Sequence, residues 1–211
     1  MDGVGLAYMC KAAISAGYGS LTVSANQLDD AWKWTQNARI ALFTRLDMLS
    51  SLALPEIMFR EIKSAFTRGA DGAELVLPPS FFMLDFSNVP SEVDEYLGAA
   101  AEAAAGRPLK IAIETSFLSN AADIKATLAL VAGYGFAYIK SASGLYASSS
   151  TLAHLNAMLE EAWFSPGLGV DFLFEPTAGE HAAEGAFRLA RKILKDGGRI
   201  VVSIPHERAY K

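Results

Sequence analysis

Short runs rich in Val, Ile, Leu and Phe alternate along this chain with longer stretches that suit helices, and this alternation limits the fold most strongly. One junction recurs, in which an apolar helical stretch meets a glycine suited to end a helix and then a β-rich run. It occurs in "AAISAGYGSLTV" (12–23), "SAFTRGADGAELVLP" (64–78) and "LALVAGYGFAYIK" (128–140). Strands that alternate with helices pair in parallel, so we expect an α/β fold with a parallel sheet.

Seven candidate strands are recognisable, and a helix at 4–16 precedes the first of them. The strands lie near 20–25, 39–46, 73–78, 109–115, 136–142, 170–175 and 199–204. A strand about every 30 residues is typical of a (β/α)8 barrel of about 250 residues. We therefore predict one TIM-type barrel domain over residues 1–211, with its first strand missing or degenerate. An open sheet is the alternative, but neither "GVGLAY" nor "GLGVDF" has the glycine spacing of a phosphate loop.

Composition excludes several classes of function. The formal net charge of -5 and the absence of a basic stripe argue against nucleic acid and anionic membranes as partners. We see no targeting segment and no apolar run of the roughly 20 residues that a membrane span requires. The single cysteine, Cys10, cannot form an internal disulfide, which favours a cytoplasmic location. The three histidines, His154, His181 and His206, lack ligand spacing, so we expect no metal.

Alternation along the strands predicts which side chains face the barrel interior. In a barrel, the face of a strand toward the helices is the more apolar one. On 109–114 this rule puts Leu109, Ile111 and Ile113 toward helices and the intervening residues inside. Applied to the other strands as well, it places these charged residues inside: Glu74, Lys110, Glu114, Lys140, Asp171 and Glu175.

Two buried lysines need an explanation, because a buried charge is costly unless it is paired or used. Lys110 lies near the start of its strand, where an ion pair with Glu74 or Glu114 explains it without any catalytic role. Lys140 lies late in its strand, at the end where barrel active sites form, and the small residues 141–144 follow it. Burial favours the neutral amine that forms Schiff bases, although a surface lysine is the alternative for Lys140.

Four segments of the chain resemble deoxyribose-phosphate aldolases, which are class I aldolase barrels. They are "RGADGAELVLP" (68–78), "LKIAIETSFLSNAADI" (109–124), "GFAYIKSASG" (135–144) and "FEPTAGEHAAEGA" (174–186), in the family's order and spacing. The resemblance implies a barrel that cleaves 2-deoxyribose 5-phosphate to acetaldehyde and glyceraldehyde 3-phosphate, with Lys140 as the Schiff-base lysine and without a cofactor or metal.

The resemblance also implies roles for other residues. Glu74 stands where the family has a proton-relay aspartate, and Lys110 matches a family lysine. The family's phosphate-binding segments fall on small residues whose backbone N–H groups would hold an anion, and ordinary tight turns are the alternative explanation for them. These candidate phosphate residues are Ser143, Gly144, Gly179 and Ser203.

Two features depart from the family's pattern. The family's opening strand has no counterpart in "MDGVGLAY". Glu175 occupies the position of a second active-site lysine, and a carboxylate there would favour the ammonium form of Lys140. We interpret Glu175 either as a replacement acid or base or as the mark of lost activity.

We therefore predict a class I aldolase, a carbon–carbon lyase whose substrate is a small phosphorylated sugar or aldehyde. Two alternatives stay open. One is a catalytically silent barrel that serves as a binding or assembly partner. The other is a class I aldolase for another aldehyde or keto acid. A homo-oligomer is compatible with all three.

Overall fold

The computed structural model describes residues 3–46, 54–77, 91–118, 120–144, 150–165, 167–173, 185, 188–190, 192–193 and 199–203. The chain divides into two compact units. The first consists of Met1–Leu75 and Gly98–Leu109, and the second of Val76–Leu97 and Lys110–Lys211. This division does not test the single domain expected over residues 1–211, which stays a prediction.

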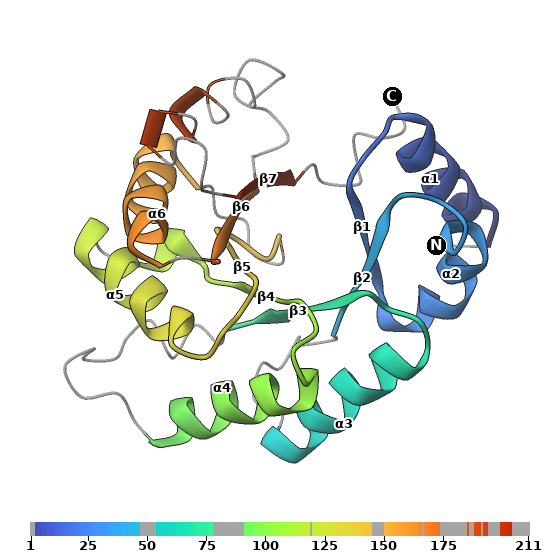
Figure 1. Cartoon of the computed structure of the whole chain (residues 1–211), viewed down its shortest axis with the longest axis horizontal. Coiled ribbons are helices and arrows are strands. Elements are labelled where there is room, and N and C mark those ends of the chain that lie inside the picture. The colour runs from blue at the N-terminus through green and yellow to red at the C-terminus, as the bar shows by residue number, and fades with distance from the viewer. Residues whose placement is uncertain are drawn as a thin grey trace. The chain divides into compact units, whose positions relative to one another are not determined.

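The first unit begins with helix α1 (Gly3–Ser15), as the sequence predicted for 4–16. Strand β1 (Ser20–Ser24), the 3-10 turn η1 (Ala25–Gln27), helix α2 (Leu28–Thr35), strand β2 (Ala41–Arg45), helix α3 (Pro55–Thr67) and strand β3 (Gly72–Val76) follow. Strand β2 pairs in parallel with β1 and with β3. Helices α1 and α2 lie side by side (Figure 1).

The second unit contains strands β4 (Leu109–Ala112), β5 (Tyr138–Lys140), β6 (Gly169–Leu173) and β7 (Arg199–Ser203). Consecutive strands of this set pair in parallel. Helices α5 (Ala121–Ala132) and α6 (Leu152–Phe164) lie beside each other, and the 3-10 turn η3 (Thr115–Phe117) follows β4 (Figure 1). Helix α4 (Ser91–Ala104) passes from this unit into the first one. The predicted α/β class with parallel strands is confirmed.

Each of these strands lies at a position that the sequence predicted, with differences at the ends. Strand β5, expected at 136–142, is shorter by two residues at each end, and the largest difference at a single end is at β4, which was expected to continue to 115 but ends at Ala112. The chain then enters η3, but two backbone hydrogen bonds still join the residues after β4 to the end of β5 and the residue that follows it. The Ile113 N–H donates to the Lys140 carbonyl (2.8 Å) and the Thr115 N–H to the Ser141 carbonyl (3.0 Å).

The repeated helix-to-strand junction has a backbone cause. One glycine of each copy has a positive φ: the first glycine in the first two copies (Gly17 and Gly69) and the second in the third (Gly135). A residue with a side chain is strained in this conformation, and glycine is not. At Gly17 the turn also brings the Tyr18 N–H to the Ala13 carbonyl (3.0 Å), which ends α1 as a Schellman-type cap does.

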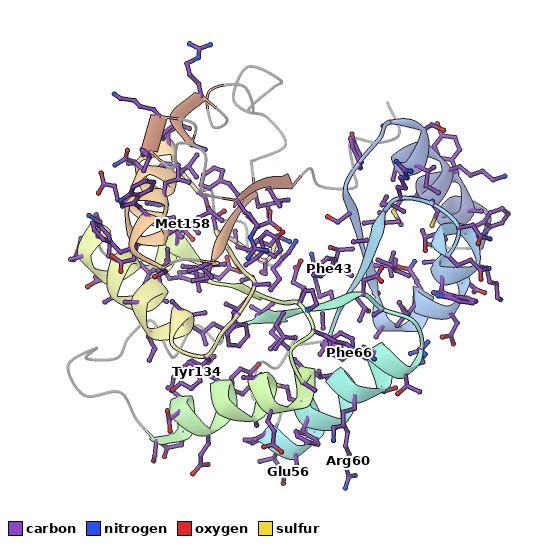
Figure 2. The ribbon with its side chains drawn as sticks, in the orientation of Figure 1. Phe43, Glu56, Arg60, Phe66, Tyr134 and Met158 are labelled. Atoms are coloured by element: carbon purple, nitrogen blue, oxygen red, sulfur yellow. The ribbon has the colours of Figure 1, made fainter. Side chains whose placement is uncertain are left out.

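Strands β3 and β4 are buried on both faces, as strands of a parallel sheet covered by helices are. The residues predicted to meet helices, Leu109, Ile111 and Ile113, are all buried. Within the first unit, Phe66 lies on the face of α3 turned toward the strands, and Glu56 and Arg60 lie on the opposite face (Figure 2).

The start of β6 offers a test of this packing. A Cβ added at Gly169 would lie 2.5 Å from ring atoms of Tyr138. That ring lies between two cations, because the Arg199 guanidinium is 5.0 Å and the Lys110 ammonium 5.8 Å from its centroid. Gly169→Ala should therefore lower the free energy of unfolding, measured in urea, by about 1–3 kcal/mol.

Gly98 provides the matched control. It lies within α4, and nothing stands within 4 Å of an added Cβ. Gly98→Ala should therefore raise stability, by up to about 1 kcal/mol, because alanine favours a helix. Equal effects of the two substitutions would contradict the crowding inferred at Tyr138.

Candidate functional site

A buried ion pair crosses the second unit from β4 to β6. The Lys110 Nζ donates to the Asp171 Oδ2, and the two side chains are only 3% and 0% exposed. This contact shows that Lys110 and Asp171 lie on the same face of the strands, as alternation predicted. Lys110 thus forms a buried ion pair, as expected, but the partner in this salt bridge is Asp171 and not Glu74 or Glu114, which the sequence had suggested.

Strand register places Lys140 on this same face. Lys140 is paired with Ala112 on β4 and with Asp171 on β6. Residues that are paired in a parallel sheet lie on the same face of it. Lys140 therefore lies beside Asp171, on the strand between Lys110 and Asp171. Its side chain is buried, with 3% of its surface exposed. The alternative of a surface lysine is therefore wrong.

The loop after Lys140 is held from both neighbouring strands. From the β4 side, the buried Glu114 carboxylate accepts the Ser143 backbone N–H at its Oε1 (2.8 Å). From the β6 side, the Leu173 backbone N–H donates to the Ser141 Oγ (3.0 Å). The position of the loop is thus fixed by polar contacts that are themselves buried or partly buried.

Glu74 is described in the first unit. Its side chain is fully buried, and its Oε1 lies 3.2 Å from the Nε of Arg45, which is one-third exposed. The proposed proton-transfer role of Glu74 toward Lys140 stays a prediction.

Of the predicted phosphate residues, Ser143 and Gly144 follow β5 and Ser203 ends β7, the two strands that flank β6. A Cβ at Gly144 would touch the Leu173 side chain (3.4 Å), and Leu173 is the register partner of Ser203. Gly179 lies outside the described residues, and so does Glu175. Anion binding by these residues stays a prediction.

Sequence reasoning missed two residues of this site. Asp171 and Glu114 were both placed inside by alternation, but neither was chosen as a functional residue. For Asp171 the available signal was its position on the strand after Lys140, which makes the two residues neighbours in a parallel sheet. For Glu114 there was no comparable signal, because its contact with Ser143 depends on the conformation of two loops.

His154 and Cys10 are two further reactive side chains among the described residues. His154 completes a capping box at the start of α6, where its Nδ1 accepts the Thr151 N–H (3.3 Å), and burial lowers its pKa. Cys10 is buried, and burial raises the pKa of its thiol, which makes it less reactive. His181 and His206 lie outside the described residues.

Three observations bear on other kinds of site. Among the residues that the structure describes, no group of three or more His, Cys, Asp or Glu could hold a metal ion. No described helix is both long and apolar enough to cross a membrane. Two pockets of about 410 and 450 Å³ are lined by other residues, and neither lining includes Lys140, Lys110 or Asp171.

The buried ion pair predicts a large effect on stability. Asp171→Asn keeps the size of the side chain but leaves the Lys110 ammonium buried without the charge of its partner. We expect the free energy of unfolding in urea to fall by about 3–5 kcal/mol. The exposed pair of Lys125 and Glu160 (2.6 Å) is the control, and Glu160→Gln should leave stability close to that of the wild type. If the two substitutions lowered the free energy of unfolding by similar amounts, the conclusion that the Lys110–Asp171 salt bridge stabilises the fold would be contradicted.

Comparison with known proteins adds a family resemblance to this geometry. No protein-family model matches the chain. A deoxyribose-phosphate aldolase of Coprothermobacter proteolyticus is 22% identical over 162 residues, which cover 77% of this chain and 71% of that protein. A structure from Coccidioides immitis, provisionally described as a deoxyribose-phosphate aldolase, matches with a TM-score of 0.81 and 17% identity over 96% of this chain and 76% of that chain.

The deoxyribose phosphate aldolase of Aeropyrum pernix, described as having a unique tetrameric structure, matches with a TM-score of 0.75 and 15% identity. The match covers 96% of this chain and 80% of that one. Identities this low establish likeness of fold, and a fold can carry many reactions. The resemblance of this chain to deoxyribose-phosphate aldolases, at wide divergence, is confirmed.

Proposed function

We propose that this protein is a class I aldolase in which the Lys140 amine forms a Schiff base with an aldehyde. The observation that carries the proposal is the placement of Lys140. It is buried at the end of β5, beside the Lys110–Asp171 ion pair and ahead of a loop of small residues. The ends of parallel strands are where enzymes of this fold class place their chemistry. The likeness to deoxyribose-phosphate aldolases supports the same reaction class.

The proposed reaction needs only the amine and groups that move protons. The Nζ of Lys140 adds to the substrate's carbonyl carbon, and loss of water gives a protonated imine. A base then removes the proton of the hydroxyl two carbons away. The bond between the hydroxyl-bearing carbon and the carbon next to the imine then breaks, and its electron pair moves into the imine to form an enamine. The hydroxyl-bearing carbon leaves as the carbonyl of the first aldehyde. Protonation of the enamine and addition of water release the second aldehyde and restore the amine.

Other residues have proposed roles in this reaction. Glu74 and Glu175 are candidates for the acid and base, and Lys110 is held near the site by Asp171. The first substrate to test is 2-deoxyribose 5-phosphate, with Ser143, Gly144, Gly179 and Ser203 proposed to receive its phosphate.

The architecture that we propose is a closed (β/α)8 barrel formed by one domain, with its first strand missing or degenerate. A cytoplasmic homo-oligomer is part of the same proposal. The tetramer of the Aeropyrum pernix enzyme supports self-association in this fold family.

Trapping the imine tests the central step. Incubation with acetaldehyde and borohydride at mildly alkaline pH should leave a reduced ethyl adduct on Lys140, identified by peptide mapping. Lys140→Met should abolish this adduct. Lys125→Met, which removes a partly exposed lysine of α5, should leave the adduct unchanged.

Absence of an adduct on Lys140, under conditions that modify Lys125, would contradict the enzyme proposal. The chain would then be a catalytically silent barrel that acts as a binding or assembly partner. An adduct on Lys140 without cleavage of 2-deoxyribose 5-phosphate would favour a class I aldolase for another aldehyde or keto acid.

The role of Glu175 gives a second prediction. If its carboxylate faces Lys140, it favours the ammonium form, which cannot attack a carbonyl. Glu175→Lys should then raise cleavage activity at pH 7 and move the pH optimum downward, and Glu175→Gln should do the same more weakly. Loss of a measurable wild-type activity in both variants would show instead that Glu175 is itself the working acid or base.

A further inference from the structure

We propose that Asp171 is the counter-ion of the protonated imine that forms on Lys140, and that Lys110 holds this carboxylate in place. The inference rests on the proposed function, because it assigns a further residue to the same reaction. Asp171 contacts the reacting nitrogen in this account, so its role is catalytic. Lys110 acts through Asp171 and is a positioning residue.

Asp171 is the direct neighbour of Lys140 in the sheet. The two residues are paired in the register of β5 and β6, and just after this pair the Ser141 N–H donates to the Asp171 carbonyl (2.9 Å). Neighbouring strands lie about 4.8 Å apart, and paired residues point to the same face. The Asp171 carboxylate therefore lies alongside the Lys140 side chain.

The salt bridge between Lys110 and Asp171 crosses β5 just before Lys140. On β5, Tyr138 is the register partner of Lys110, and Lys140 is the register partner of Asp171. Tyr138 and Lys140 are two residues apart and share a face. The Lys110 ammonium lies 5.8 Å from the centroid of the Tyr138 ring, which agrees with this course. The salt bridge thus passes between these two side chains, with its carboxylate on the strand position level with Lys140.

Burial makes the charge of Asp171 important for Lys140. The exposed fractions of Lys110, Lys140 and Asp171 are 3%, 3% and 0%. Charges interact more strongly where water is excluded, and a buried cation needs a partner of opposite charge. Imine formation turns the Lys140 nitrogen into a cation at this place, so the reaction needs a carboxylate among its buried neighbours.

Strand β7, on the far side of β6, brings no charge level with Asp171. The β7 residue paired with Asp171 is Val201. Arg199 starts β7, and its guanidinium lies 5.0 Å from the centroid of the Tyr138 ring, at the beginning of β5. The charged groups of β4, β6 and β7 on this face, within the described residues, are therefore Lys110, Asp171 and Arg199.

Glu114 is the other buried carboxylate of this region. It follows β4, and its Oε1 accepts the Ser143 N–H (2.8 Å), three residues after Lys140. Asp171 is level with Lys140 itself. Glu175 lies outside the described residues. Among the carboxylates that the structure describes in this unit, Asp171 is thus the one that strand register places beside the reacting nitrogen.

The pairing with Lys110 suits both stages of the proposed reaction. Before substrate binds, the Lys110 ammonium offsets the charge of Asp171, which alone would favour the unreactive ammonium form of Lys140. The neutral Lys140 nitrogen then bonds to the carbonyl carbon, one water leaves, and one proton from the acid of the reaction gives the protonated imine. An imine is a weaker base than its parent amine. A hydrogen bond from the imine N–H to Asp171 keeps it protonated, and a carboxylate has two oxygens with which to accept from both lysines.

Opposite shifts in pH dependence test this role. The protein is incubated with acetaldehyde and cyanoborohydride, which reduces protonated imines, and the adduct on Lys140 is measured by peptide mapping across a range of pH. We expect the optimum for adduct formation to move down by about one pH unit or more in Asp171→Asn, which removes a negative charge. It should move up by a similar amount in Lys110→Met, which removes a positive charge. Both substitutions break the same salt bridge, so a merely structural role would not shift the optimum in opposite directions.

A double variant keeps the test decisive if Asp171→Asn does not fold. Lys110→Met combined with Asp171→Asn leaves no unpaired buried ammonium, and replacement of both members of a buried pair is often tolerated. This variant differs from Lys110→Met only in the charge at position 171, so its optimum should lie about one pH unit or more below that of Lys110→Met. Glu160→Gln, which removes a carboxylate of α6 paired with Lys125, should leave the wild-type optimum unchanged.

A second measurement needs no aldehyde. In protein labelled with ¹³C-lysine, the chemical shift of the Lys140 Cε reports the charge on its amine as the pH is raised, and Lys140→Met assigns the signal. The midpoint of this titration should be lower in Asp171→Asn and higher in Lys110→Met than in the wild type. Equal midpoints in the three proteins would overturn the counter-ion role.

The outcomes separate this inference from the proposed function. An adduct on Lys140 with the same pH optimum in the wild type and in both single variants would overturn the counter-ion role and leave the aldolase proposal standing. An adduct with opposite shifts would support both. Absence of an adduct on Lys140 in the wild-type protein would overturn the aldolase proposal and the counter-ion role with it.

Discussion

The cost of burying charge inside a parallel sheet governs the second unit of this protein. Strands β4, β5 and β6 are largely buried on both faces, yet one face carries Lys110, Lys140 and Asp171, and the buried Glu114 follows β4. Such groups must be paired or hydrogen-bonded, because an isolated buried ion is unstable. Two contacts meet this requirement. The salt bridge between Lys110 and Asp171 joins β4 to β6 across β5, and the Ser143 N–H, in the loop after β5, donates a hydrogen bond to the Glu114 carboxylate. Lys140 lies on β5, between the strands that carry Lys110 and Asp171. Contacts made by residues of these neighbouring strands therefore define its surroundings.

Much of this arrangement could be predicted from the sequence, because strand alternation and glycine junctions are local properties. The β-rich runs located the strands, and the apolar parity of 109–113 placed Lys110 inside. The partner of Lys110 could not be predicted, because it depends on register: Lys140 pairs with Asp171, which brings Asp171 within reach of Lys110 across β5. The sequence also placed the end of β4 too late. The residues after Ala112 have a high β propensity, but the chain leaves the strand there and enters the turn η3.

The loop after Lys140 is held by a contact that the sequence could not predict. Small residues at 141–144 are compatible both with a phosphate cradle and with a tight turn, and sequence cannot distinguish the two. The structure directs one of the loop's N–H groups toward a buried carboxylate, and this contact joins residues 29 positions apart.

A crystal structure of the protein after reduction with borohydride in the presence of acetaldehyde would test the central claim most directly. The account predicts an ethyl group on the Nζ of Lys140, at the end of β5, with the salt bridge between Lys110 and Asp171 retained beside it. An unmodified Lys140 in a protein whose surface lysines are ethylated would contradict the account, and so would an adduct on Lys110 in its place.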